Sequence, residues 1–521
     1  MSTLGGLALN PNHCASLMTT SRRIALLFAA ENVNAIIGWI ALLFVARKMG
    51  ATALGEFSYA LSLVGGFTFL AFLGFNMAHV KRVSEGQDLG KCIGTFITIR
   101  LFLLSLMLTI FALFYWFWHN FLDKQLYDTT SEMLFLVVIY YVIFLLVGIM
   151  TATFSGLKQS ARVALPNIIG TSVRSGMFIA VALLGWSVTW LAWSYIVGVI
   201  IIAILSFWYF RDYPISRPNK DTFQYYKIYA LPVAAASIFG VFRQYIDKIL
   251  IGIFWTASDV GLYFGVQRIS LFIGSMALAI EGMLLPAVSS LHSIKENEKI
   301  KHLIYDAEKY VSMVCIPVVV MTVVWSSEII LVFISREFLE AARILKLLAL
   351  VALVRVMNRP WSVALRGSDR PDLTSLLNIL MSIFSIALML ILVPKTIPQL
   401  GLNNLAGLGG EGAALSILIA EIVTGISLRI LCYLNLDMNP SGNSILQLAF
   451  AFIVGLIMWQ VQLNVLVDRW YELFLFSAFG GILYISLLAA VGAFTNKDYL
   501  FFKNLLNPKD MKDYIGEEMS R

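Results

Sequence analysis

Charged side chains within an apolar part of the chain are the first candidates for chemistry. Arg243, Asp247, Lys248 and Arg268 lie in a stretch that long apolar runs flank on both sides. A charge in hydrocarbon costs at least a few kcal/mol, so such residues normally face a protein interior or a water-filled cavity. Because Arg243 and Asp247 are four residues apart, they share a helix face and can pair. Residues 257–263 predict a short turn, so we expect two helices that offer charge to an internal space.

Polar residues recur at helical spacing in other apolar segments. Side chains three, four or seven residues apart lie on one face of a helix. Two such groups are Arg355, Arg359, Ser362 and Arg366 in one segment and Glu421 with Thr424 in another. The candidate substrate-binding residues of the chain are Arg243, Asp247, Lys248, Arg268, Arg355, Arg359, Arg174, Glu31, Asn34, Gln267 and Glu281.

The balance of these internal charges indicates the kind of ligand. Six cations (Arg174, Arg243, Lys248, Arg268, Arg355 and Arg359) stand against four anions (Glu31, Asp247, Glu281 and Glu421). A cationic surplus suits an anionic substrate such as a phosphate or pyrophosphate group, because arginine binds phosphate through two parallel hydrogen bonds and keeps its charge when desolvated. Glu31 and Glu281 either neutralise cations or carry a coupling proton. The alternative is that these residues form structural ion pairs between helices, such as Arg243 with Asp247.

The composition identifies the elements that must position these residues. The 521 residues are 59% hydrophobic and only 13% charged, whereas soluble globular proteins carry about 25% charged residues. We therefore expect an all-α, polytopic membrane protein. The four cysteines and five histidines are dispersed, so the sequence predicts neither a disulfide framework nor a metal site, and no cofactor. No cleavable signal peptide is expected, because no small-residue cleavage site follows the first apolar segment.

The apolar segments predict about fourteen transmembrane helices, since each span needs about 20 mostly apolar residues. With the N-terminus inside, the inner segments hold 22 Lys and Arg residues and the outer segments hold 8. This bias predicts that both termini are cytoplasmic. Arg100 lies near a span end, from which its long side chain can reach the interface. The first two spans are expected at 24–46 and 56–78.

Two internal matches predict a repeat of six spans. Residues 51–57 parallel residues 257–263, and 158–162 parallel 366–370, at offsets of 206 and 208. Two repeats joined by a polar linker are typical of transporters, with the substrate path between them. The expected organisation is a cytoplasmic N-terminus at 1–23, an N-lobe at 24–209, a cytoplasmic linker at 210–227, a C-lobe at 228–433, two additional spans at 445–494 and a cytoplasmic tail at 495–521.

At several points the chain resembles the polysaccharide-repeat-unit flippases, the O-antigen type translocases of the multidrug/oligosaccharidyl-lipid/polysaccharide exporter superfamily. The segments that carry this resemblance are Ala46–Gly50 with Leu54-Gly55, Leu231-Pro232, Asp247–Gly252 followed by Val260–Tyr263, Leu285-Pro286 and Gly409–Ala414. The resemblance runs from about Arg23 to Leu434. It implies fourteen helices in two lobes, a cationic central cavity that opens alternately to each side, and a polyprenyl-pyrophosphate-linked oligosaccharide as cargo.

The sequence thus predicts a flippase, not an enzyme, that serves cell-surface polysaccharide or glycan assembly. We expect a multi-pass protein of a bacterial or archaeal plasma membrane, a monomer, with a lipid-linked oligosaccharide as substrate and glycan polymerase or assembly proteins as possible partners. A drug or metabolite exporter of the same superfamily is the main alternative, but it would require an acidic cavity. A membrane-embedded polymerase or transferase would require a long outer loop or an acidic catalytic motif, and the sequence has neither.

Overall fold

The computed structural model describes residues 11–121, 128–398, 401–439, 443–465, 467–495 and 498. These residues form mainly helices, which confirms the all-helical prediction. The helices are α1 (Pro11–Phe67), α2 (Phe69–Phe72), α3 (Phe75–Ser84), α4 (Leu89–Phe121), α5 (Asp128–Gly156), α6 (Ser160–Leu184), α7 (Thr189–Phe210), α8 (Lys220–Phe254), α9 (Ala257–Ser293), α10 (Asn297–Val324), α11 (Ser326–Phe333), η1 (Arg336–Ala341), α12 (Ala342–Gly367), α13 (Pro371–Leu392), α14 (Gly409–Leu436), α15 (Asn443–Asn464) and α16 (Trp470–Ala490).

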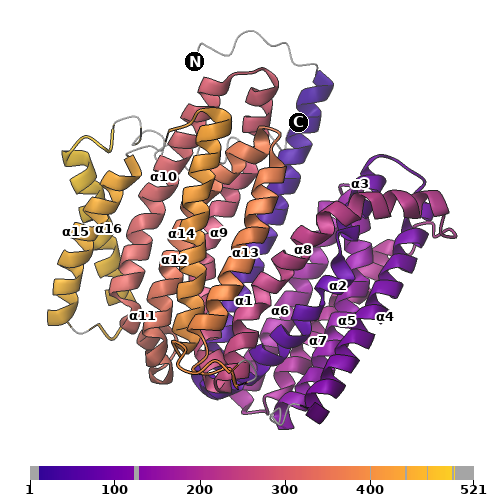
Figure 1. Ribbon diagram of the computed structural model, residues 1–521, viewed down its shortest axis with the longest axis horizontal. Coiled ribbons are helices and arrows are strands. Elements are labelled where there is room, and N and C mark those ends of the chain that lie inside the picture. Colours follow the sequence, from indigo (N-terminus) through magenta and orange to yellow (C-terminus); the bar gives the residue numbers. More distant parts are fainter. Residues whose placement is uncertain are drawn as a thin grey trace.

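The helices form two bundles. In Figure 1, α2 to α8 lie on the right and α9 to α16 on the left, with α1 between them. The bundles converge at the lower end, near α11, and diverge toward the upper end. A single large core joins the bundles at the converging end, with Phe57 of α1, Ile251 of α8, Tyr263 of α9 and Leu345 of α12 among its buried side chains. This core therefore holds the two bundles together at the converging end.

Ten helical segments of the described residues are long and apolar enough to cross a membrane. One of them, Asn32–Phe72, has 41 residues and contains a kink at Gly50, whose φ of 82° lies outside the helical region. Three long helices, α8, α9 and α12, are not among the ten. These three helices carry Arg243, Arg268 and Arg355.

The predicted second span, 56–78, is not one continuous helix. α1 ends at Phe67, the short α2 follows, and the chain turns through positive φ angles at Leu73 and Gly74 before α3 begins. Arg100 of α4 is fully buried beside this break, and its Nη1 donates to the carbonyl oxygen of Ala71 at 2.6 Å. The expectation that Arg100 reaches the interface is wrong, because its guanidinium satisfies a carbonyl that the broken helix leaves free.

The predicted turn at 257–263 is helical. Only Trp255 and Thr256 separate α8 from α9, because Thr256 caps α9: its Oγ1 accepts from the Asp259 amide at 3.3 Å, and Asp259 Oδ2 accepts from the Thr256 amide at 3.0 Å. This reciprocal capping box starts the helix at Ala257. α8 begins at Lys220, within the predicted linker 210–227.

The converging end depends on a backbone contact between the two matched segments. A Cβ atom built on Gly55 of α1 would lie 1.7 Å from the carbonyl oxygen of Ala257, and one built on Gly261 of α9 would lie 1.9 Å from that of Ala51. Both positions thus require glycine, since no other residue leaves room for the crossing. Nearby, Glu337 of η1 accepts a hydrogen bond from the Ala51 amide at 2.8 Å.

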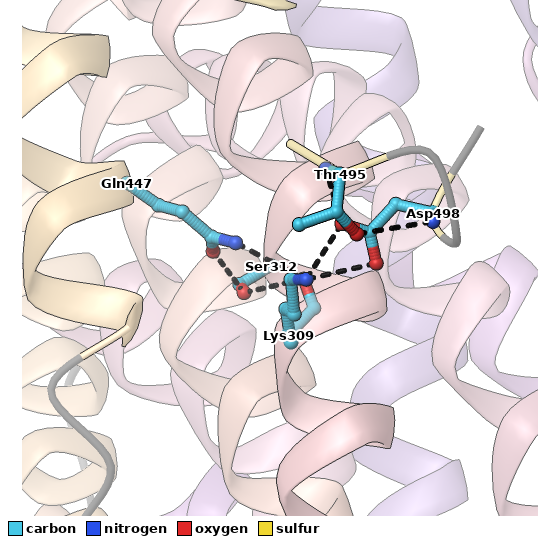
Figure 2. A network of polar contacts seen from close by, with 5 residues as sticks. All are labelled: Lys309, Ser312, Gln447, Thr495 and Asp498. Atoms are coloured by element: carbon cyan, nitrogen blue, oxygen red, sulfur yellow. Dashed lines mark hydrogen bonds and ion pairs between the residues drawn. The ribbon is translucent and has the colours of Figure 1, made fainter. Parts of the chain in front are cut away.

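A polar network fixes α15 and α16 to the left-hand bundle. Figure 2 shows that Lys309 of α10 points toward Asp498, which follows α16 in the chain, with distances of 2.7 and 2.8 Å from Nζ to the two carboxylate oxygens. Asp498 is buried, and Thr495 donates to it through its amide and hydroxyl, both at 2.8 Å. On the other side, Ser312 of α10 donates to Gln447 of α15. We call these five residues the C-terminal clasp.

Asp498→Asn should loosen this clasp. Burial alone would raise the pKa of Asp498, but the hydrogen bonds from Lys309 and Thr495 outweigh it and lower the pKa below the ordinary value of 3.8. A lowered carboxyl pKa stabilises the folded state above the unfolded pKa, and that stability is lost as the pH falls through the folded value. We expect the variant to lose about 1–3 kcal/mol of stability at neutral pH, measured by thermal unfolding in detergent. Lys299→Gln, which removes an exposed pair on the same α10, should change nothing measurable.

Candidate substrate site

The polar residues of α8, α12, α13 and α14 surround a cavity of about 420 Å³. Four arginines line it, Arg243 of α8 and Arg355, Arg359 and Arg366 of α12. The three on α12 lie at intervals of four and seven residues, so they occupy one face of the helix. We call this space the arginine cavity. It brings together three of the predicted cationic residues and adds Arg366.

Glu421 of α14 joins two of these arginines. Its Oε1 accepts from Arg355 Nε at 2.9 Å and from Arg243. Its backbone oxygen also accepts from the side-chain amide of Asn358 at 2.9 Å. The Glu421 carboxylate is nearly buried, whereas the Arg243 and Arg355 side chains are 29% and 34% exposed. The two guanidinium groups therefore bind the carboxylate and still face the cavity.

Glu281 of α9 joins the other two arginines. Its Oε2 lies 2.5 Å from Arg359 Nη1 and its Oε1 lies 2.6 Å from Arg366 Nη2. These charge-assisted hydrogen bonds use one donor of each guanidinium group, which has five. Arg366 also donates from Nε to the Ser362 carbonyl at 3.5 Å.

The arginine cavity carries a positive surplus. Four guanidinium groups stand against the two carboxylates of Glu281 and Glu421, which leaves two positive charges among these residues. Arginine remains protonated in a partly desolvated site, so the surplus persists over the physiological pH range. An anion with two negative charges would neutralise it.

The predicted pair of Arg243 with Asp247 is wrong. Asp247 instead pairs with its neighbour Lys248, whose Nζ lies 2.7 Å from Oδ1. Tyr263 and Gln267 of α9 each donate to Asp247 Oδ2 at 2.9 Å, and Lys248 donates to Gln267 Oε1 at 3.2 Å. Both charges are buried and their hydrogen bonds go to protein atoms. This cluster therefore links α8 to α9, and neither charge lines the arginine cavity.

Lys248→Met should be strongly destabilising. Removing one partner of a buried ion pair leaves the Asp247 charge uncompensated, which costs about 3–5 kcal/mol. We expect a large drop in melting temperature or in the yield of folded protein. The matched control is Lys301→Met, because Lys301 pairs with Glu298 at 2.8 Å at the exposed start of α10. Equal melting temperatures for both variants would contradict the buried pair.

Arg174, Arg268 and Asn34 line a second, larger cavity of about 640 Å³ between α1, α6, α7, α9 and α16. Its wall is mostly apolar and aromatic. Arg174 lies over the Tyr195 ring at 4.6 Å and Arg268 over the Phe264 ring at 5.0 Å, which are cation–π distances. Among the described residues, no carboxylate lies within ion-pair distance of either arginine.

The predicted set therefore divides into three places. Arg243, Arg355, Arg359 and Glu281 belong to the arginine cavity, Asp247, Lys248 and Gln267 to the buried cluster, and Arg174, Arg268 and Asn34 to the aromatic cavity. The side chain of Glu31 lies outside the described residues. Sequence reasoning left Arg366 and Glu421 out of the candidate set, although the stripe on α12 and the face shared by Glu421 and Thr424 were the signals that could have included them.

Arg429, a further arginine within α14, shows what a structural pair looks like here. Its Nη2 lies 2.5 Å from Glu308 Oε1, its Nη1 donates to the Gly425 carbonyl at 3.1 Å, and its guanidinium lies over the Trp361 ring at 5.1 Å. Glu308 is almost fully buried. In the arginine cavity, by contrast, each carboxylate binds two arginines.

Comparison with known proteins gives a family and a fold. Residues 21–292 match the model of a family described as polysaccharide biosynthesis protein. The chain is 23% identical over 378 residues, 72% of its length and 78% of the relative's, to a protein of Haloferax volcanii described as a probable low-salt glycan biosynthesis flippase, Agl15.

Solved structures share the architecture. The lipid II flippase MurJ, in an inward closed conformation, superposes with a TM-score of 0.69 over 89% of this chain and 98% of its own, at 16% identity. An inward-facing multidrug resistance MATE transporter of the MOP superfamily superposes with a TM-score of 0.58 over 80% of this chain and 97% of its own, at 14% identity. At these identities the likeness establishes the fold, that of a multi-pass membrane protein.

Proposed function

Because this chain belongs to the polysaccharide biosynthesis protein family, we propose that it is a flippase that carries a polyprenyl-pyrophosphate-linked oligosaccharide across the plasma membrane for cell-surface glycan assembly. The family match confirms the resemblance identified in the sequence. The observation that carries the proposal is the arginine cavity, in which four guanidinium groups share two carboxylates.

The charge of the cavity fits this cargo. A pyrophosphate esterified at both ends keeps one ionised oxygen on each phosphate, so the group has two negative charges, which equals the surplus of the cavity. Guanidinium groups bind such oxygens through paired, charge-assisted hydrogen bonds. A cationic drug would instead meet net repulsion here, which disfavours the drug-exporter alternative.

The architecture supports alternating access. We infer fourteen crossings, six in an N-lobe at 24–209, six in a C-lobe at 228–433 and two at 445–494. The kink at Gly50 divides α1 into two crossings, and α8, α9 and α12 cross despite their charges because those charges face the cavities and the buried cluster. Rocking of one lobe against the other would separate the lobes at the converging end and bring them together at the diverging end.

The Lys and Arg bias supports a cytoplasmic position for both termini, so the diverging end of the two bundles would face the cytoplasm. The head group would enter the arginine cavity from that side, while the lipid tail stays in the bilayer. The aromatic cavity, with its apolar wall and two arginines, would accommodate a part of the cargo next to the pyrophosphate. We expect a monomer that delivers its cargo to glycan polymerase or assembly proteins.

The relatives agree with this cargo class. The name of the Haloferax volcanii relative describes a probable flippase of glycan biosynthesis. The cargo of this chain is our inference from the family and from the charge of the arginine cavity.

Reconstituted transport tests the proposal. The purified protein is placed in liposomes that contain a fluorescent polyprenyl-pyrophosphate oligosaccharide, and the fraction accessible to an external quencher is followed with time. We expect transfer between leaflets that empty liposomes do not show. Equal accessibility in protein-containing and empty liposomes, with cargo taken from the source cell, would reject the flippase. If the protein instead transfers a cationic dye and not the lipid-linked oligosaccharide, the drug-exporter alternative would be favoured.

A further inference from the structure

The two carboxylates of the arginine cavity occupy arginine pairs that a diphosphate would need. Glu421 bridges Arg243 and Arg355, and Glu281 bridges Arg359 and Arg366. Each bridge is one negative group held by two guanidinium groups. One phosphate of a diphosphate diester has the same charge and the same ability to accept two hydrogen bonds.

The burial of these groups gives the order in which a ligand meets them. The Glu281 and Glu421 side chains are 18% and 6% exposed, whereas the four arginine side chains are 29–35% exposed. A ligand that enters the cavity therefore contacts the guanidinium groups first, with the carboxylates behind them. It competes with the carboxylates for the arginine hydrogens while both charges remain in place.

A transporter must also release its cargo. Four arginines without counter-anions would hold a dianion tightly, and transport requires binding that is strong enough to load and weak enough to leave. A carboxylate fixed behind each arginine pair lowers the affinity and forms hydrogen bonds with the arginines again when the ligand departs. The cost of exposing empty arginine pairs is thereby reduced in the unloaded protein.

We propose that Glu281 and Glu421 are internal counter-anions that compete with the cargo diphosphate for the same arginine pairs and thereby set its release. This inference rests on the proposed function, since it requires that the arginine cavity bind a diphosphate. It assigns the two glutamates to release, whereas the arginines load the cargo.

Charge removal without change of shape tests this role. In Glu421→Gln and, independently, Glu281→Gln, the side chain keeps its size and one acceptor oxygen but loses its charge. We expect each variant to bind inorganic pyrophosphate at least about tenfold more tightly than the unaltered protein, measured by titration calorimetry on the full-length protein in detergent. In liposomes, half-saturation should occur at lower cargo concentration while the maximal rate falls at least about tenfold.

A control variant separates loss of charge in the cavity from loss of charge at the surface, and two negative outcomes can be told apart. Glu298→Gln removes an exposed carboxylate paired with Lys301 and should leave binding and transport unchanged. If the two glutamates merely support the fold, both variants will melt earlier and bind pyrophosphate no more tightly, which overturns the inference and leaves the flippase standing. If the unaltered protein neither binds pyrophosphate nor flips the cargo, the proposed function fails, and the inference fails with it. Glu281 is the less buried of the two, so its variant provides the test if Glu421→Gln does not fold.

Discussion

Replacing Arg355 and Arg359 together by glutamine should reduce cargo flipping by more than about a hundredfold. Each hydrogen bond to a charged group contributes about 1.5–3 kcal/mol, and a tenfold change corresponds to about 1.4 kcal/mol. The pair of changes spares the fold for a specific reason. Glu421 keeps Arg243 and Glu281 keeps Arg366, so neither carboxylate loses its last arginine.

The measurement combines flipping in liposomes with pyrophosphate titration. The matched control is Arg343→Gln on the same α12, because the Arg343 side chain is 81% exposed and lies 3.8 Å from Glu411 at the surface. Arg359→Lys should recover only part of the loss, since an ammonium group cannot form the paired hydrogen bonds of a guanidinium group. Unchanged flipping in the double variant would assign these arginines to structural pairs.

Gly261→Val should strongly destabilise the folded protein. The first side-chain carbon at this position would lie 1.9 Å from the carbonyl oxygen of Ala51, which belongs to the backbone and cannot rotate away. The α1–α9 crossing at the converging end must therefore separate, which we expect to cost about 3 kcal/mol or more. The consequence is a lower melting temperature and a shorter lifetime of the folded protein in detergent.

A second glycine of α9 provides the comparison. A Cβ built on Gly274 meets no atom within 4 Å, so Gly274→Val tests the same change of residue in the same helix without the clash. We expect it to melt within a few degrees of the unaltered protein. Should both variants melt at the same temperature, the close crossing of α1 and α9 would be contradicted.

The sequence predicted the class of the molecule because hydrophobicity is a local property. Segments of about 20 apolar residues define helices wherever they pack, and the structure confirms an all-helical, multi-pass protein. The sequence did not predict the start of α9, where Thr256 and Asp259 form a capping box beside a segment that was interpreted as a turn. The sequence also did not predict the helix break at Leu73 and Gly74, because the apolar composition continues through this break.

The sequence by itself determined that charges lie inside an apolar chain, that cations exceed anions, and that two segments match at an offset of 206. Only the tertiary structure decided how these charges are distributed. It paired Arg243 with Glu421, 178 residues away, and not with Asp247, only four residues away. Helical spacing places residues of one helix on a face, but partners on other helices depend on how the helices pack. The same packing separated Arg268 from Arg243 and brought Gly55 against the helix that contains Gly261.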